Sequence, residues 1–344
     1  RLKPLGKLGV LGGFLMGILM KKGGARARSA YGITLLRYAY GEVVAETRTA
    51  FLENLISPFG MVLVGDTLFV ANADAVVAFP YAPGTTRITA APRKIADLPA
   101  GRNHHWTTSL GPSSEGSRLY VGVGSNSNVA ENGLEEEVDR AAILEIDPAT
   151  GARRVHASGL RNPVGMDWQP DSGKLWVAVN ERDELGNDLV PDYMTAVTPG
   201  GFYGWPWSYY GPIVDERVEP ANPAMTARAL KPDYALGAHT ASLGLTFGEG
   251  DLFPARYRGG AFVGQHGSWN RKPRNGYRVI FVPFVDGVPA GGPEDILTGF
   301  INDRDQAMGR PVGVQFDARG ALLVADDVGN VVWRVSPVER PGQP

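Results

Sequence analysis

The sequence predicts an all-β protein: a six-bladed β-propeller whose blades are four-stranded antiparallel sheets. Three observations lead to this prediction. A short motif recurs along the chain, the copies are spaced as four strands require, and the composition is rich in turn residues. The 344 residues include 45 Gly and 26 Pro, which is usual for short strands joined by tight turns, and helical periodicity is scarce.

The recurring motif is a Pro-x-Gly start, a strand, a tight turn and an alternating apolar strand. Three clear copies begin at Pro58, Pro163 and Pro311, and two looser copies cover Trp106–Gly124 and Ser242–Gly264. Turn residues between short β-branched runs indicate hairpins, and their recurrence indicates a repeat architecture. The alternating strands expected from the clear copies are Thr67–Asn72, Lys174–Val179 and Ala321–Asp326.

The spacing of the copies favours a propeller over a solenoid. It is roughly fifty to sixty residues with long insertions, about what four strands and their loops need. Division of the chain length by this spacing leaves room for about six blades.

Because the copies run from one end of the chain to the other, we expect a single catalytic propeller domain over residues 29–337, with a tail over 338–344. Residues 1–28 form a separate segment with an apolar run, Leu8–Met20, between basic residues. Two interpretations stay open: a signal-like segment, or an insertion packed on the first blade or on another protomer. The run is shorter than the about 20 residues that span a bilayer. It also predicts a membrane-surface or dimer contact, so a monomer and a homodimer both stay open.

Composition excludes several classes of function. The formal net charge of -2 gives no electrostatic reason to expect nucleic acid as a partner. The absence of cysteine excludes disulfides and thiolate metal sites. The sequence also has no phosphate-binding glycine loop and no serine nucleophile elbow.

The most informative stretch is Gly159–Pro206. It holds the Arg161-Asn162 pair, a loop dense in charge at Asn180–Asp188, and the glycine and aromatic turn Gly200–Pro206. Folding alone does not require this collection, whereas an anionic ligand and a hard cation do. The loop from Glu181 to Asp192 is therefore a candidate calcium site, and salt bridges within the loop are the alternative.

Candidate catalytic residues lie where blades begin. His105 precedes a strand and is a candidate general base near neutral pH, the alternative being a polar loop residue. Arg161 offers a fork of donors beside Asn162, and Arg310 occupies the matching position of the last copy. Arginine suits bidentate contact with carboxylates, and an arginine that bridges blades is the alternative.

Two further candidates complete the expected site. Lys272 lies in a basic and aromatic loop, Gln265–Arg274, which is either a source of cationic charge near the same face or a solvated hairpin tip. His239 leads into the preceding strand and is expected to face the centre as well.

Taken together, these segments resemble the glucose/sorbosone dehydrogenase family, whose members are six-bladed propellers that bind pyrroloquinoline quinone (PQQ). Within it the chain is most similar to the L-sorbosone dehydrogenase branch, from about Ser29 to Val335. The pieces that carry the resemblance are Asn103–Thr107, Gly159–Met166, Asn180–Tyr193, Gly201–Pro206, Gly264–Arg274 and Gly309–Val314.

The resemblance implies a role for each candidate. His105 stands at the place of the catalytic base, and the pair Arg161 and Asn162 at the place that contacts the quinone and the substrate oxygen. The residues expected to bind the cofactor are Arg161, Asn162, His239, Lys272 and Arg310. The residues expected to hold calcium are Arg182, Asp183 and Glu184, which replace a Gly-Pro turn whose backbone oxygens bind the ion in the family.

The chain also departs from the family pattern. Val164 replaces a glutamine, Val312 replaces the second arginine of the final blade, and the loop near Arg37–Glu46 lacks the aspartates of close relatives.

The expected function is PQQ- and calcium-dependent oxidation of an aldose sugar or a sorbosone-type aldehyde. His105 would assist hydride transfer to the quinone, an external electron acceptor would reoxidise it, and the location would be the bacterial periplasm or the exterior. Two alternatives stay open. One is a calcium-dependent lactonase-type hydrolase that turns over without quinone, and the other is a non-catalytic propeller that binds sugar or protein through Trp106, Trp205 and Trp269.

Overall fold

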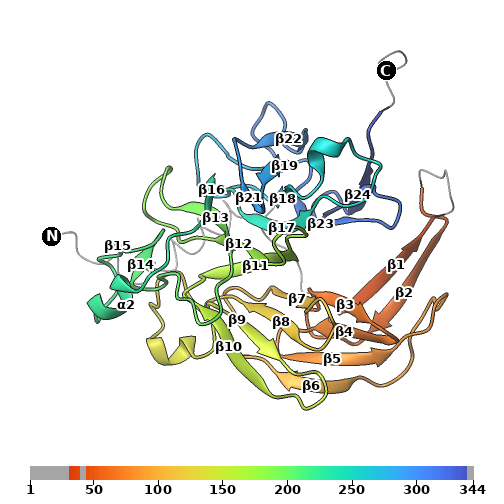
Figure 1. The fold of residues 1–344 in the computed structure, drawn as a ribbon, viewed down its shortest axis with the longest axis horizontal. Helices are drawn as coiled ribbons and strands as arrows, with labels where there is room; N and C mark the ends of the chain where they lie inside the picture. Colours follow the sequence, from red (N-terminus) through yellow and green to blue (C-terminus); the bar gives the residue numbers. More distant parts are fainter. Residues whose placement is uncertain (1–30, 39–43, 339–344) are drawn as a thin grey trace. The chain divides into compact units, whose positions relative to one another are not determined.

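The computed structural model describes residues 31–38 and 44–338. The segment 1–28, the centre of the loop near Arg37–Glu46 and nearly all of the tail 338–344 lie outside these residues. No helix in the described part of the chain is long and apolar enough to cross a membrane. The regular structure of that part is almost entirely short antiparallel strands, so the all-β prediction is confirmed (Figure 1).

Contacts divide the chain into two compact units, which are described one at a time. The first unit comprises the described residues of Arg28–Met166 together with Thr198–Lys231. Its sheets are β1-β2 (Gly32–Arg37, Thr47–Glu53), β3-β4-β5-β6 (Met61–Val64, Thr67–Ala71, Ala75–Pro80, Arg93–Asp97), β10-β9-β8-β7 (Arg153–Ser158, Ala142–Ile146, Leu119–Val123, Thr108–Pro112) and the short pair β14-β15 (Ser208–Tyr209, Ile213–Val214). Two short helical segments complete it, η1 (Leu134–Glu137) and α2 (Pro223–Ala227).

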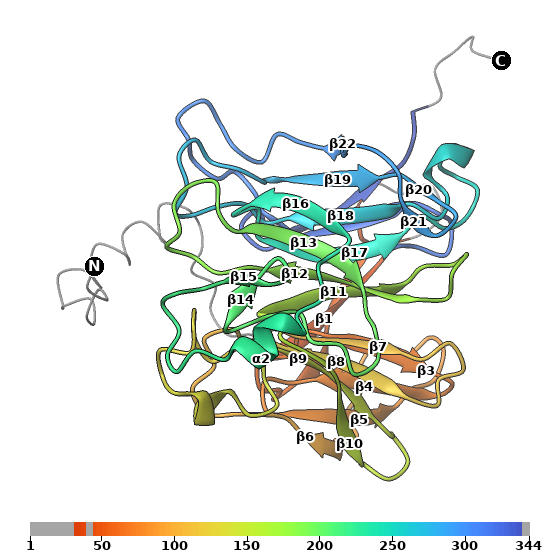
Figure 2. The same cartoon turned by 60° about the vertical axis from the view of Figure 1, so that its left-hand side comes forward.

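The second unit comprises the described residues of Asp167–Val197 and Pro232–Pro344. Strand β11 (Asn162–Trp168) carries the chain into it and heads the sheet β11-β12-β13-β16, with β12 at Leu175–Asn180, β13 at Pro191–Ala196 and β16 at Tyr234–Ala238. The next sheets are β17-β18-β19-β22 (Ser242–Phe247, Ala261–Gln265, Arg278–Val282, Glu294–Leu297), β20-β21 (Phe284–Val285, Val288–Pro289) and β23-β24-β25 (Pro311–Phe316, Leu322–Asp326, Val331–Val335). A short helix, η2 (Ala255–Tyr257), precedes β18, and Figure 2 shows these strands from a second side.

The prediction of six blades is wrong, because the described residues form five blade sheets, four with four strands and one with three. Each of the five motif copies begins one of them, at β3, β7, β11, β17 and β23. The sixth blade was expected from the chain length and from the resemblance to six-bladed propellers, and no motif copy accounts for it. That length is taken up by the excursion of residues 198–231 between β13 and β16, and by residues ahead of β3, where the described ones form the hairpin β1-β2.

Strand β5 shows why the blades of the first unit stack. Its side chains alternate, so Val76 and Ala78 join a core with the β7–β10 sheet, while Val77 and Phe79 join a core with the β1-β2 hairpin. Both faces of the strand are therefore buried, and each fully buried large side chain contributes about 1.5–3 kcal/mol. In the second unit β18 does the same: Val263 packs toward β12 and β13, and Phe262 packs toward Phe316 of β23.

Gly60 explains the glycine of the first Pro-x-Gly start. Its N–H donates to the carbonyl of Thr108 at 2.9 Å, so β3 approaches the next sheet through backbone alone. A Cβ at this position would lie 2.3 Å from the backbone nitrogen of Leu110. Only glycine fits such a close approach.

Candidate functional site

His105 is held by Ser125 in the first unit. Its Nδ1 lies 3.0 Å from both the carbonyl oxygen and the Oγ of Ser125. Because a carbonyl oxygen can only accept, this contact selects the tautomer with the proton on Nδ1. The lone pair of Nε2 is then the one that can take up a proton from a ligand.

The surroundings of His105 keep it neutral. Burial lowers its pKa well below the ordinary value, and the positive charge of Arg161 lowers it further, with smaller effects from His104 and Arg140. The hydrogen bond to Ser125 acts in the opposite direction and is outweighed. A neutral imidazole at pH 7 can serve as a base, which is what the sequence analysis proposed for it.

Arg161 and Asn162 lie beside His105. Arg161 is 3% exposed, and it donates from Nε to the carbonyl of Asn128 at 3.1 Å and from Nη2 to the Oδ1 of Asn128 at 2.9 Å. Asn162 is also buried, and its Oδ1 has no hydrogen-bond partner among the described residues. Gly124 lies between the two residues, since a Cβ there would be 2.4 Å from the Cβ of His105 and 2.6 Å from the Oδ1 of Asn162. The structure thus brings together three of the predicted residues.

Sequence reasoning missed the loop that holds these three residues. Ser125 contacts His105, and Asn128 contacts Arg161 and also accepts a hydrogen bond at 3.0 Å from the indole N–H of Trp205. The only signal in the sequence is the polar run Ser125–Asn128 directly after a buried strand. Such a run is typical of turns, and nothing in it indicates which side chains it will hold.

Arg310 is the centre of a second cluster, in the second unit. It is 1% exposed, donates from Nε to the carbonyl of His266 at 2.7 Å and from Nη2 to the carbonyl of Gly267, and its guanidinium lies over the ring of Tyr277. Its Nη1 is buried and has no hydrogen-bond partner among the described residues. A buried guanidinium with a remaining donor is suited to an anionic oxygen.

The predicted partner of Arg310, Lys272, is exposed, and its backbone N–H donates to the Oδ1 of Asn187 at 3.4 Å. The cation next to Arg310 is instead Arg274. It donates to the hydroxyl of Tyr277 at 3.2 Å, and its charge helps burial to lower the pKa of Arg310. The role predicted for Lys272 stays a prediction, and Arg274 is a cation that the sequence analysis did not single out.

The predicted metal loop is closely packed with side chains of both signs. Arg182 is fully buried and paired with Glu181, with 3.0 Å between Nε and Oε2. Asp183 accepts from the amide of Asn270 at 2.8 Å, and its Oδ1 lies 3.3 Å from the Nδ1 of His239. Glu184 has a positive φ of 72°. The structure thus brings His239 to Asp183, although the two were predicted for different roles.

The side chains of this loop are paired with one another. The carboxylate of Asp183 raises the pKa of His239, and the buried Arg182 is paired with Glu181 at the place predicted for calcium. Within residues 31–38 and 44–338, no three His, Cys, Asp or Glu side chains gather in a way that holds a metal ion. Calcium therefore stays a prediction that rests on the backbone oxygens of Arg182–Glu184.

Asp192 hydrogen-bonds to the beginning of this loop and to the residue next to His239. It is 3% exposed, and its carboxylate accepts from the backbone N–H of Glu181 at 2.8 Å and from the hydroxyl of Thr240, next to His239, at 2.9 Å. Burial raises its pKa to about 6.

We expect Asp192→Asn to reduce the loss of stability with rising pH. Because the pKa of Asp192 is higher in the folded protein than in an unfolded chain, ionisation of the buried carboxyl costs stability as the pH rises from about 4 to 7. The cost is on the order of 3 kcal/mol. Asparagine cannot ionise and keeps an acceptor for the N–H of Glu181. Urea unfolding at pH 4, 5, 6 and 7 measures the slope. The control is Asp251→Asn, at an exposed carboxylate that is paired with Arg258. If the dependence of stability on pH is the same in Asp192→Asn as in the wild type, the raised pKa of Asp192 is contradicted.

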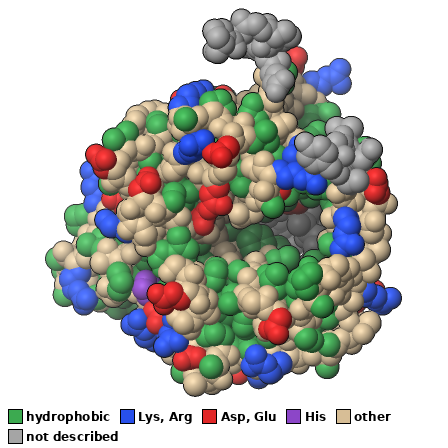
Figure 3. All heavy atoms as spheres, turned by 45° about the vertical axis from the view of Figure 1, so that its right-hand side comes forward, with side chains coloured by type: hydrophobic (Ala, Val, Ile, Leu, Met, Phe, Trp, Pro, Cys, Tyr) green, Lys and Arg blue, Asp and Glu red, His purple; other side chains and the backbone are tan. Residues whose placement is uncertain are grey.

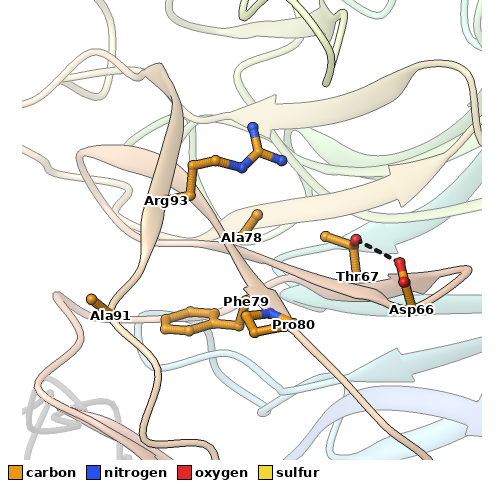
Figure 4. A pocket seen from close by; sticks show the side chains of 7 residues that line it. All are labelled: Asp66, Thr67, Ala78, Phe79, Pro80, Ala91 and Arg93. Carbon is orange, nitrogen blue, oxygen red and sulfur yellow. Dashed lines mark hydrogen bonds between the residues drawn. The ribbon is translucent and has the colours of Figure 1, made fainter.

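Two hollows contain none of the predicted residues. One, of about 330 Å³, lies on the β3–β6 sheet, where Thr67 donates to Asp66 at 3.2 Å and Arg93 extends over Ala78 (Figure 4). The other, of about 220 Å³, is lined mainly by apolar residues of the excursion 198–231, Trp207 and Val218 among them.

Figure 3 shows one face of the molecule, where acidic and basic side chains are interspersed, as the small net charge leads one to expect.

Comparison with known proteins decides the family. The model of the TrAA12-like family matches residues 28–198 and 215–337, which is most of the chain.

The chain belongs to the TrAA12-like family.

Curated relatives include a PQQ-dependent pyranose dehydrogenase of Coprinopsis cinerea, 25% identical over 337 residues that cover 80% of this chain and 45% of that protein. An uncharacterized protein of Borreliella burgdorferi is 31% identical over 224 residues, which cover 64% of this chain and 58% of that protein. The chain thus spans less than two thirds of the length of these relatives.

Solved structures show the same fold. The holo PQQ domain of the Coprinopsis cinerea pyranose dehydrogenase has a TM-score of 0.75 at 22% identity, covering 89% of this chain and 88% of that one. A calcium structure of the Trichoderma reesei family AA12 enzyme has a TM-score of 0.74 at 20% identity, covering 88% and 87%. The PQQ-bound aldose sugar dehydrogenase of Streptomyces coelicolor has a TM-score of 0.61 at 17% identity, covering 90% and 88%. The predicted kinship with PQQ-dependent sugar dehydrogenases is thus confirmed at the level of the TrAA12-like family, and the sorbosone branch stays a prediction.

Proposed function

We propose that this member of the TrAA12-like family is a PQQ-dependent oxidoreductase that oxidises a sugar at an aldose C1 hydroxyl or a hydrated sorbosone-type aldehyde. The observation that carries the proposal is the neutral His105, with its Nδ1 bonded to Ser125, beside the buried Arg161 and Asn162. The family match and the pyranose dehydrogenase relative support the same reaction class.

The residues around Arg310 fit the carboxylates of PQQ. The guanidinium is buried, and its Nη1 has no partner among the described residues. Asp327 and Arg274 bring charges of opposite sign near it. Arg310 would hold a carboxylate of the cofactor. The contacts of Arg161 and Asn162 with the cofactor stay predictions. When bound, PQQ supplies an acceptor for two electrons from the substrate carbon.

The chain's own residues supply proton transfer and charge. Nε2 of His105 takes the proton of the substrate hydroxyl, because Nδ1 is already bonded to Ser125. Arg161 stabilises negative charge that develops on the substrate oxygen, and its burial strengthens this effect. Arg161 also keeps His105 neutral and ready to accept the proton.

The proposal includes an external electron acceptor, a requirement for calcium and a location in the bacterial periplasm or outside the cell. The lactonase alternative depends on calcium at the same loop, where Arg182 is paired with Glu181 and His239 with Asp183. No step in the proposed reaction is assigned to calcium.

The test is dye reduction by the purified chain with a panel of aldoses and sorbosone, with and without PQQ, and with calcium or with a chelator. We expect reduction that requires PQQ, and PQQ binding that raises the melting temperature. Turnover that persists in the chelator would remove calcium from the proposal. Neither binding nor reduction on any substrate would contradict the function, and lactone hydrolysis would then be the next assay.

A further inference from the structure

Asn128 joins three parts of the candidate site in the first unit. Two donors of Arg161 hydrogen-bond to Asn128: Nε to its carbonyl oxygen and Nη2 to its Oδ1. The same carbonyl accepts the indole N–H of Trp205 at 3.0 Å. We infer that Asn128 is a positioning residue, which fixes the guanidinium of Arg161 beside His105 and couples this pair to the turn that carries Trp205. The inference rests on the proposed function for its catalytic consequence, and on geometry alone for the coupling.

The loop that contains Asn128 also holds the base. Ser125, three residues earlier, contacts Nδ1 of His105, and its N–H donates to the carbonyl of Arg161 at 2.8 Å. One short loop thus contacts Arg161 twice: Ser125 hydrogen-bonds to its backbone, and Asn128 to its side chain. A displacement of Asn128 changes the separation of the two proposed catalytic groups without contact to either reacting atom.

Carboxylates hold the loop in this shape. Glu131 accepts the N–H of Asn128 at 3.0 Å and that of Val129 at 2.7 Å. Glu137 accepts the N–H of Asn126 at 2.7 Å and the hydroxyl of Ser127. The amide of Asn128 is therefore presented to Arg161 by a preorganised backbone, as a positioning residue requires.

Trp205 supports the pair from the excursion of residues 198–231. It lies between the two ranges that match the family model, 28–198 and 215–337, and is 3% exposed. Its N–H donates to the carbonyl of Gly159 at 3.0 Å, just ahead of Arg161, while its indole reaches Asn128. The turn therefore supports Arg161 through its backbone and through its side-chain partner.

The first test compares Asn128→Ala with Asn128→Asp. Alanine removes the Oδ1 acceptor, and we expect kcat to fall about tenfold with a smaller change in KM, because Arg161 loses its orientation. Aspartate keeps an acceptor but adds a negative charge beside Arg161. The charged groups that act on His105 are Arg161, His104 and Arg140, so partial neutralisation of Arg161 raises the pKa of His105. The acidic limb of the profile of kcat/KM against pH should therefore move to higher pH in Asn128→Asp.

A matched pair of tryptophan variants tests the coupling to the turn. Trp205→Phe and Trp207→Phe each remove one indole N–H from a backbone carbonyl, that of Asn128 in the first case and that of Pro220 in the second. We expect kcat to fall severalfold in Trp205→Phe and to stay at the wild-type value in Trp207→Phe. Equal effects of the two variants would overturn the coupling, and this pair decides it even where an Asn128 variant does not fold.

A titration of His105 by NMR, in the chain without PQQ or substrate, separates this inference from the proposed function. A higher His105 pKa in Asn128→Ala, where no charge is added and Arg161 loses its Oδ1 acceptor, supports the inference even where the wild type shows no PQQ-dependent turnover, a result that would contradict only the function. An unchanged His105 pKa in a folded Asn128→Ala variant overturns the inference and leaves the function standing.

Discussion

Replacement of His105 by alanine is expected to lower kcat by a factor of about 10² to 10⁴ in PQQ-dependent sugar oxidation. The variant loses the imidazole that Ser125 orients, and with it the Nε2 lone pair that takes the substrate proton. Cofactor affinity should change little, because the proposed carboxylate contact lies at Arg310. Initial rates at saturating sugar and PQQ measure the effect, and a PQQ titration checks the affinity.

His104→Ala is the matched control for this prediction. His104 is exposed, and its ring lies 4.6 Å from that of His105 in an edge-on contact, so the variant removes a neighbouring imidazole without removing the base. Added imidazole should restore part of the rate to His105→Ala and none to the control. A His105→Ala variant that keeps more than about a tenth of the wild-type rate falls outside the range for a general base, and the proton would need another acceptor.

The local motifs of the sequence predicted the sheets well, because their signals are carried by backbone geometry. The Pro-x-Gly motif at Gly60 correctly predicted the start of a sheet, because the backbone approaches the next sheet too closely there to leave room for a side chain. The blade number failed because it was obtained from length and from the resemblance, and an excursion such as 198–231 adds residues without adding a blade. A count of motif copies contains this information, whereas a division of length does not.

The candidate site was predictable where residues stand at equivalent positions of the repeat. His105 and Arg161 each precede the first strand of a sheet, so a repeat places them at corresponding points. Asn128 and Ser125 were not predictable, since their contacts depend on a loop held by Glu131 and Glu137. The choice between Lys272 and Arg274 as neighbour of Arg310 likewise depends on the conformation of one hairpin, which a pattern of charges does not determine.

Replacement of Arg310 by methionine is expected to weaken PQQ binding about 10²- to 10³-fold. The loss of a buried, charge-assisted contact to an anion typically costs 2–5 kcal/mol, and the guanidinium of Arg310 is 1% exposed with Nη1 available to a ligand. Methionine fills similar space without a donor. Arg310→Lys should also bind poorly, because an ammonium cannot donate in a fork to the carbonyls of His266 and Gly267 and still reach a ligand.

Affinity must be separated from folding in this experiment, because Arg310→Met also leaves the carbonyls of His266 and Gly267 without their donor. The rise of the melting temperature on addition of PQQ makes that separation, since it compares each variant with its own free form. The wild type and the exposed control Arg304→Met should show the rise, and Arg310→Met should show none at the same PQQ concentration. A full rise in Arg310→Met would mean that the guanidinium is buried only to join these two carbonyls, and the anionic site would have to be sought at other cations of the chain.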